Sequence, residues 1–297
     1  MIEVVNATRC RLGEGALWHP TAQRLLWCDI PAGRLHMTST EDAGAQTMAT
    51  WVFGECISAA GWVTESDILL ATETRLLRLD LLRGTQTLIA NLEDEMSHTR
   101  SNDGRADPQG GFWIGTMGKK AEPGAGAIYR WHRGALRKLF GGITVPNAIC
   151  FAPDGRCAYF TDTTTQKVRR VALDGQGWPA AEPEIWLDLS GTPWWPDGAV
   201  TDAAGVFWNA QWDGSRIAAY APDGGFLRAI ELPVRRPTCP AFGGPELATL
   251  YCTSASIGLD APPGAGRAPD QTSGAPNGAL LALDCGARGR AEPAVLL

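Results

Sequence analysis

The sequence lacks any long segment with apolar residues at helical spacing, although it has 297 residues. Amphipathic helices repeat their apolar residues about every 3.6 positions. No part of this chain sustains that pattern, and its 35 glycines and 20 prolines interrupt regular helix throughout. We therefore expect very little helix and an all-β fold.

Signals for export or membrane insertion are also missing from the sequence. No run of about 18 apolar residues occurs, and the start has no basic segment followed by an apolar stretch and a cleavage site. The formal net charge is −6, whereas binding to phosphate backbones needs a basic surface. We expect a cytoplasmic protein with no nucleic-acid or membrane partner, acting on a small molecule as a monomer or weak homo-oligomer.

Several common catalytic motifs are absent. The chain has no Gly-x-Ser-x-Gly elbow, no Cys-x-x-Cys pair and no His-Glu-x-x-His helix motif. Its four histidines are predicted in turns or outer strands, so we expect none of them to be catalytic. The eight cysteines are spread along a chain far longer than a disulfide-stapled secreted domain, which predicts reduced, mostly buried thiols.

What the sequence does contain is a repeat. Six strands centred on an aromatic or large aliphatic residue follow one another at spacings of 43, 43, 46, 49 and 43 residues. Their centres are Trp27, Leu70, Trp113, Tyr159, Trp208 and Tyr251. A period in the forties is typical of propeller blades.

Each copy also shows a first strand before the centre and alternating segments after it, which gives four strands per copy. The pattern predicts a six-bladed β-propeller around a central channel, one domain over residues 1–297. The sixth copy lacks an obvious fourth strand, so either residues 2–5 or residues 294–297 should pair into it and hold the two termini close together. The Pro- and Gly-rich residues 260–277 are expected to form an inserted surface loop.

The heads of the six repeats carry an unusual set of polar residues. Counting back 11 to 13 positions from each centre reaches Glu14, Ile57 with Ser58, Asn102, Asn147, Asp197, and Thr238 with Cys239. In a propeller these points surround one mouth of the channel. Two carboxylates and two amides offer the oxygen ligands that calcium, magnesium and manganese prefer. Without a cation, Glu14 and Asp197 would repel each other.

Position within the repeat separates these residues from acids that stabilise turns. Asp154 and Asp197 stand in identical Pro-Asp-Gly tripeptides, but they precede their strand centres by 5 and 11 residues, respectively. We therefore expect Asp154, Asp107 and Asp202 to stabilise hairpin turns. Asp103 is expected to hold the bend that presents Asn102.

Five short motifs resemble one known family in order and spacing. They are Arg11-Leu12-Gly13-Glu14-Gly15-Ala16-Leu17-Trp18, Asn102-Asp103-Gly104, Pro146-Asn147, Pro196-Asp197-Gly198 and Phe242-Gly243-Gly244-Pro245. Together they resemble the gluconolactonase, regucalcin and luciferin-regenerating-enzyme-like propellers, which include bacterial sugar-acid lactonases.

The resemblance implies roles for six residues. Glu14, Asn147 and Asp197 would bind one divalent metal, with Asp197 also the general base. Arg100 and Asn102, and in some members a glutamate that matches Glu122, would contact the sugar lactone. Ala16 departs from the proline of many members, which should affect only the local turn.

The expected function is metal-dependent hydrolysis of an aldonolactone, such as glucono-, xylono-, arabino- or galactonolactone, to the open-chain acid. Ca²⁺ is the expected cofactor, with Mn²⁺, Mg²⁺, Zn²⁺ and Fe²⁺ as alternatives. Two other functions stay open, a non-catalytic calcium-binding regulatory propeller and a phosphotriesterase-like hydrolase. Polar side chains at Arg100, Asn102 and Glu122 favour a hydroxylated substrate over an apolar ester.

Overall fold

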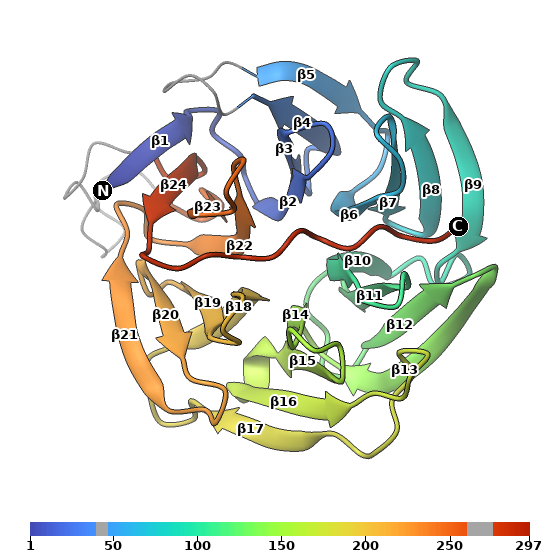
Figure 1. Cartoon of the computed structure of the whole chain (residues 1–297). Helices are drawn as coiled ribbons and strands as arrows, with labels where there is room; N and C mark the ends of the chain where they lie inside the picture. Colours follow the sequence, from blue (N-terminus) through green and yellow to red (C-terminus); the bar gives the residue numbers. More distant parts are fainter. Residues whose placement is uncertain (40–46, 260–275) are drawn as a thin grey trace.

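Six four-stranded antiparallel sheets form a ring around a central channel (Figure 1). The structure is a computed structural model, and it describes residues 1–39, 47–259 and 276–297. Each sheet is one blade of the expected six-bladed β-propeller. The predicted inserted loop at 260–277 falls almost wholly outside the described residues. Within them, no helix is long and apolar enough to cross a membrane.

Strands succeed one another outward from the channel in each blade. Blade 1 contains β2 (Gly13–His19), β3 (Arg24–Asp29), β4 (Arg34–Thr38) and β5 (Thr47–Val52). Blade 2 contains β6 (Ile57–Trp62), β7 (Asp67–Thr72), β8 (Arg75–Asp80) and β9 (Gln86–Asn91). Blade 3 contains β10 (Thr99–Ala106), β11 (Phe112–Gly118), β12 (Gly126–His132) and β13 (Ala135–Ile143).

The second half of the ring repeats this order. Blade 4 contains β14 (Pro146–Phe151), β15 (Cys157–Asp162), β16 (Lys167–Ala172) and β17 (Glu184–Asp188), with a short 3₁₀ helix, η1 (Thr163–Thr165), after β15. Blade 5 contains β18 (Trp195–Thr201), β19 (Phe207–Trp212), β20 (Arg216–Tyr220) and β21 (Phe226–Glu231). Blade 6 contains β22 (Pro237–Gly243), β23 (Thr249–Ser254), β24 (Leu280–Asp284) and β1 (Ile2–Asn6).

Burial follows distance from the channel, as expected for sheets that pack face to face around a ring. The six predicted strand centres all lie in the second strands and are buried between neighbouring blades. The outermost strands are far more exposed, and β5 alternates half-buried with exposed residues along its length. One face of such a strand packs on the blade and the other faces solvent.

The N-terminal strand closes the ring. β1 pairs antiparallel with β24, with Ile2 opposite Leu283 and Val4 opposite Leu281. Of the two segments that could complete the sixth blade, residues 2–5 therefore do so. The N-terminal segment is thereby held in the blade of the last copy, where β1 covers the edge of β24.

The chain's last residues, 285–297, form a segment that we call the C-terminal strap. It leaves β24 and crosses the channel to the opposite side of the ring (Figure 1). Backbone hydrogen bonds anchor its far end, from Val295 N to Trp62 O at 2.8 Å and from Leu296 N to Gly110 O at 2.8 Å. The prediction that the termini lie close together is wrong, because the strap ends beside blades 2 and 3 while β1 belongs to blade 6.

The cysteines and turn acids behave as predicted. All eight cysteines are free thiols, and six of them are buried. Asp107 accepts hydrogen bonds from the backbone N–H groups of Gln109 and Gly111 in its turn, and Asp202 does the same for Ala204 and Val206. Asp154 accepts from the backbone N–H of Arg156.

Candidate functional site

A cavity of about 340 Å³ opens at the channel mouth where the innermost strands begin. Glu14, Arg100, Asn102, Asn147 and Asp197 line it. They come from β2, β10, β14 and β18, so residues up to 183 positions apart in the sequence meet at one place. Their convergence agrees with the phase of the repeat.

A β-bulge presents the polar residues in each innermost strand. The pairing between first and second strands shifts register in all six blades, between Glu14 and Leu17 in blade 1 and between Asn147 and Cys150 in blade 4. The other shifts occur at matching positions in blades 2, 3, 5 and 6. A bulge bends the strand and re-aims a side chain. Here it turns side chains that would face a neighbouring blade toward the channel mouth.

The backbone at two of these bulges is left-handed. Gly15, directly after Glu14, has φ 59°, and Ala148, directly after Asn147, has φ 56°. A Cβ at Gly15 would also stand 2.5 Å from the carbonyl oxygen of Ser58. Ala148 lacks the freedom of glycine, so its conformation costs roughly 1 to 2 kcal/mol and is held by the surrounding sheet.

Glu14 and Asp197 are buried carboxylates without a cationic partner. Neither forms a salt bridge among the residues that the structure describes, and Glu14 accepts a hydrogen bond only from its neighbour Gly15 N, at 3.2 Å. Burial, followed by the nearby charges of Asp197 and Asp103, raises the pKa of Glu14 well above its usual value. Burial and the charge of Asp103 raise the pKa of Asp197. The site is therefore short of positive charge.

Asp103 links blades 3 and 4 beneath this pair. Its carboxylate accepts a hydrogen bond from Ile149 N at 2.7 Å, so it holds the neighbouring inner strand as well as its own bend. Burial raises the pKa of Asp103 to about 6, although this hydrogen bond opposes the shift. Asp103 does not line the cavity.

A chain of hydrogen bonds fixes the amides and the arginine. Arg100 Nη1 donates to Asn102 Oδ1 at 2.9 Å. Asn102 Nδ2 donates to Asn147 Oδ1 at 3.2 Å, and Asn147 Nδ2 donates to Thr163 Oγ1 at 2.9 Å. Thr163 Oγ1 in turn donates to the carbonyl of Pro196, next to Asp197, at 2.7 Å. The chain thus runs from Arg100 and Asn102 of blade 3 through Asn147 and Thr163 to the backbone of blade 5 beside Asp197.

The donor set fits a divalent cation of the hard type. Two carboxylates and an amide oxygen offer oxygen ligands only, and the unpaired negative charge of Glu14 and Asp197 favours a bound cation. Among the described residues, no group of three or more His, Cys, Asp and Glu side chains is arranged for metal binding. Asn147 would be the third protein ligand.

Glu122 is the one expected site residue that does not line the cavity. It lies in the loop between β11 and β12, where its Oε2 accepts a hydrogen bond from Lys120 N at 3.0 Å. Backbone hydrogen bonds lower the pKa of its carboxyl group. Its neighbour Ala121 does line the cavity, so Glu122 stands at the rim, and its role in substrate binding stays a prediction.

Among the cavity-lining residues that sequence reasoning missed, Met117, Thr163 and Trp212 share one position in the repeat. Each follows the centre of its second strand by four positions, since the centres are Trp113, Tyr159 and Trp208. The second strand runs antiparallel to the first, so its end returns to the mouth where the first begins. Counting four positions forward from each strand centre, as well as 11 to 13 positions backward, would have found them.

Comparison with known proteins places this propeller in an established family. The profile described as "SMP-30/Gluconolactonase/LRE-like region" matches residues 12–256, and the chain belongs to this family. That confirms the resemblance drawn from the five motifs.

Individual relatives cover nearly the whole chain. A "Putative sugar lactone lactonase" of Rhizobium meliloti is 37% identical over 96% of this chain and 94% of its own length. The "Pentonolactonase XacC" of Haloferax volcanii is 36% identical with the same coverage. The crystal structure of "a calcium-binding protein, regucalcin" from Agrobacterium tumefaciens is 37% identical and superposes with a TM-score of 0.93, covering 100% of this chain and 98% of that one.

Proposed function

We propose that this protein hydrolyses a sugar-acid lactone to the open-chain aldonic acid. The observation that carries the proposal is the pair of buried carboxylates, Glu14 and Asp197, that lack a cationic partner beside the N–H donors of Arg100 and Asn102. Relatives that match over almost all of this chain are named as lactonases, among them pentonolactonase and L-arabinolactonase.

We propose Glu14, Asn147 and Asp197 as ligands of one divalent cation, with Ca²⁺ first because all the donors are oxygen atoms. Bound there, the cation would polarise the lactone carbonyl and lower the pKa of nearby water. Three protein ligands are fewer than the six to eight that calcium takes, so room for substrate remains. The similar regucalcin is described as a calcium-binding protein.

The remaining chemistry belongs to the side chains. Asp197 accepts the proton of the attacking water as general base, which contributes typically about 100 to 10,000 fold. Arg100 donates hydrogen bonds to substrate oxygens from the position that its contact with Asn102 fixes. Asn102 Nδ2 donates to the carbonyl of Pro146 and to Asn147 Oδ1 in this structure, so Asn102 would donate to a substrate by exchanging one of these two bonds. The indole of Trp212 gives the cavity an apolar wall against which the face of a sugar ring packs.

The test separates the lactonase from the two alternatives. Initial rates are measured on glucono-, xylono-, arabino- and galactonolactone, corrected for spontaneous ring opening, with added Ca²⁺ and with chelator. We expect turnover on at least one lactone that chelator abolishes and Ca²⁺ restores. Calcium binding without turnover would favour the regulatory propeller, and faster hydrolysis of an aryl phosphotriester than of any lactone would favour the phosphotriesterase-like enzyme.

Asp197→Asn isolates the base from the metal ligand. The amide keeps an oxygen donor but accepts no proton, so at saturating Ca²⁺ kcat should fall by about 100 fold or more. Asp154→Asn is the matched control, because it makes the same change in an identical tripeptide that forms a turn. Near-parental kcat in the metal-saturated Asp197→Asn protein would remove Asp197 from the role of base and leave the metal site standing.

A further inference from the structure

A second cavity lies at the opposite end of the channel, and the proposed reaction does not use it. Its volume is about 180 Å³. Residues at the ends of the innermost strands line it, including Ala106, Phe151 and Thr201, together with the C-terminal strap. Since the candidate active site is built on the beginnings of the same strands, the two cavities open at opposite mouths.

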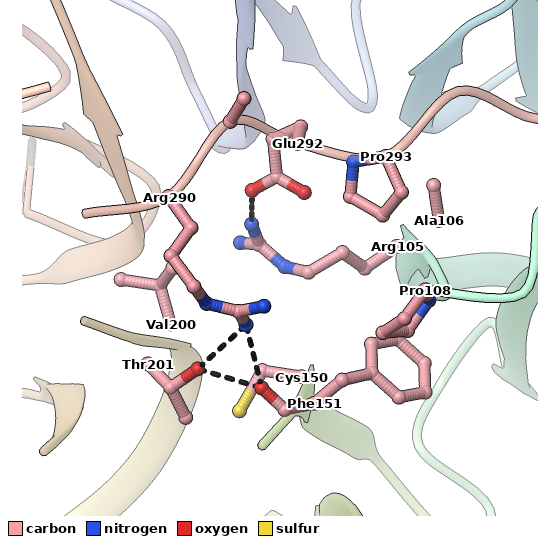
Figure 2. A pocket seen from close by; sticks show the side chains of 11 residues that line it. Arg105, Ala106, Pro108, Cys150, Phe151, Val200, Thr201, Arg290, Glu292 and Pro293 are labelled. Atoms are coloured by element: carbon pink, nitrogen blue, oxygen red, sulfur yellow. Dashed lines mark hydrogen bonds and ion pairs between the residues drawn. The ribbon is translucent and has the colours of Figure 1, made fainter. Parts of the chain in front are cut away.

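Two arginines reach into this cavity from opposite sides (Figure 2). Arg105 comes from the end of β10 and Arg290 from the strap. Arg105 is buried and forms an ion pair with Glu292 of the strap, and its Nη2 donates to the carbonyl of Pro240 at 3.1 Å. Arg105 and Glu292 thus balance each other as a pair, and the guanidinium of Arg290 is a further positive charge that lines the cavity.

Arg290 is held almost entirely by neutral acceptors. Its Nη2 donates to the carbonyl of Phe151 at 3.1 Å and to Thr201 Oγ1 at 3.3 Å. Its Nη1 donates to the carbonyl of Pro153 at 3.2 Å. These contacts aim the guanidinium and do not neutralise it. Burial and the charge of Arg105 lower the pKa of Arg290, yet an arginine keeps its proton at neutral pH.

Each arginine also has a buried donor that no group satisfies. Among the described residues, the Nε atoms of Arg105 and Arg290 are buried without a hydrogen-bond partner. A buried N–H left without an acceptor costs about 1 to 3 kcal/mol, and more in a charged group. Both Nε atoms are shielded from the cavity, so an anion there would be held by the Nη groups: Arg105 Nη1 and Arg290 Nη1 each carry two hydrogens and donate one of them, to Glu292 and to the carbonyl of Pro153.

The other lining residues indicate which kind of anion fits. Ala106, Pro108, Phe151, Val200 and Pro293 give the cavity apolar walls. A phosphate needs donors around all four of its oxygens, whereas here the cationic donors are Arg105 and Arg290 and the carboxylate of Glu292 also lines the cavity and would repel it. A carboxylate needs few donors and carries its charge on one end of a carbon skeleton, which the apolar walls accommodate.

We propose that the cavity between Arg105 and Arg290 binds a small carboxylate anion, with its carboxylate bridging the two guanidinium groups and its carbon chain against the apolar walls. The site is distinct from the candidate active site and needs no metal. Such an anion would also tie the strap, through Arg290, to β10, because both guanidinium groups would hold it.

Propionate is the probe, and the melting temperature Tm is the readout. Propionate replaces chloride at constant ionic strength, with chelator present so that no cation at the other mouth binds it. We expect Tm to rise by about 2 to 4 °C at propionate concentrations well above the dissociation constant. Phosphate should give a smaller rise at the same concentration.

Arg290→Gln should abolish the propionate response, because it removes one of the bridging charges. Arg288→Gln is the matched control, since it removes a strap arginine that is exposed and pairs with Glu246 at 3.2 Å outside the cavity. Its response should equal that of the parent. Equal responses in both variants, or none in the parent, would overturn the proposal, as would a larger response to phosphate.

Two further arms complete the test. If Arg290→Gln fails to fold, a crystal of the parent protein soaked in 3-bromopropionate should show bromine inside this cavity, beside its apolar walls and with the carboxylate toward Arg105 and Arg290, and bromine outside the cavity would count against the site. Gluconate distinguishes the source of the ligand, since the proposed reaction would make such an acid. If gluconate raises Tm as much as propionate does, the product of the proposed reaction is a ligand of this cavity. If propionate alone raises Tm, the ligand is an unrelated short-chain acid.

Discussion

At the scale of single residues, the site is defined by charges that the protein leaves uncompensated. Other buried charges are paired, as in the ion pair formed by Arg130 and Asp107. At the channel mouth, Glu14 and Asp197 have no such partner, and Arg100 donates to Asn102 and to the carbonyl of Ser101. Buried charges without partners are costly, so their retention points to a function that needs them.

Glu14→Gln should therefore act in opposite directions on stability and on metal binding. Without metal, the substitution removes a buried charge that Asp197 and Asp103 repel, so Tm should rise. With metal, it removes a charged ligand, so the affinity for Ca²⁺ should fall at least about tenfold, or about 1.4 kcal/mol. Calorimetry with chelator and titration with Ca²⁺ measure the two effects. A lower Tm in chelator together with parental affinity would contradict the ligand assignment.

Trp212 gives a second prediction at this scale, which concerns the substrate. The guanidinium of Arg236 lies 4.7 Å from the centre of its ring on one side, while Trp212 contributes to the cavity wall. Trp212→Ala should raise KM by about threefold to tenfold, the value of one aromatic contact, with a smaller effect on kcat. Trp178→Ala is the control, because Trp178 also stacks against an arginine, Arg130 at 4.4 Å, but lies outside the cavity. Equal KM changes in both variants would exclude a contact with substrate.

At the scale of secondary-structure elements, the innermost strands combine two tasks. Their later residues pack between blades as ordinary buried strand, whereas the bulge near their start turns polar side chains into the channel mouth. The second strands β11 and β19 complete the site with Met117 and Trp212, and η1, directly after β15, adds Thr163. A hydrogen bond between these elements, from Asn209 Nδ2 to the carbonyl of Asp197 at 3.0 Å, fixes the bulge of blade 5.

Gly15→Ala tests the bulge of blade 1. The new Cβ would meet the carbonyl of Ser58 at 2.5 Å while φ is 59°, so both a steric clash and backbone strain are introduced. Gly134→Ala is the control, because Gly134 has φ 84° and nothing within 4 Å of a Cβ. Denaturant unfolding should show the control losing about 1 kcal/mol and Gly15→Ala losing more. Equal losses in the two variants would mean that the bulge of blade 1 rearranges around the new Cβ with no additional loss of stability.

The features that follow the repeat could be predicted from the sequence, whereas the features that depart from the repeat could not. The strand centres and channel positions follow from a period that every blade must satisfy in order to pack on the next, which is why Glu14, Asn147 and Asp197 could be placed together. The bulges could not be predicted, because a one-residue irregularity is small beside the variation in blade length. Glu122 lies in a loop, whose course the period does not constrain.

At the scale of the whole molecule, the C-terminal strap is the feature that the repeat could not reveal. Residues 285–297 contain neither strand alternation nor a seventh copy of the repeat. Their position depends on single contacts made after the ring has formed, such as the hydrogen bond from Trp62 Nε1 to the carbonyl of Glu292 at 2.7 Å and the burial of Val295 in the core between blades 2 and 3. The strap covers the mouth opposite the candidate active site.

The ion pair between Arg105 and Glu292 gives the strap a measurable share of global stability. Both side chains are about 9% exposed, and the pair joins β10 to the strap. Glu292→Gln leaves the buried Arg105 without its charged partner, so the free energy of unfolding should fall by about 3 to 5 kcal/mol. Replacing both residues, Arg105→Met with Glu292→Met, removes both charges and should recover most of that loss.

Urea unfolding of the parent, Arg105→Met, Glu292→Met and the double variant forms a closed cycle that isolates the interaction of the pair, and lactone hydrolysis supplies an independent readout. The ion pair lies at the mouth opposite the candidate active site, and none of the described residues that line the candidate active site bonds to Arg105 or Glu292. Folded Glu292→Gln protein should therefore keep kcat within about twofold of the parent at saturating Ca²⁺. A stability equal to that of the parent would show that Arg105 finds other compensation. A large fall in kcat with stability intact would mean that the two mouths of the channel are coupled, and that closure of one helps to set the geometry of the other.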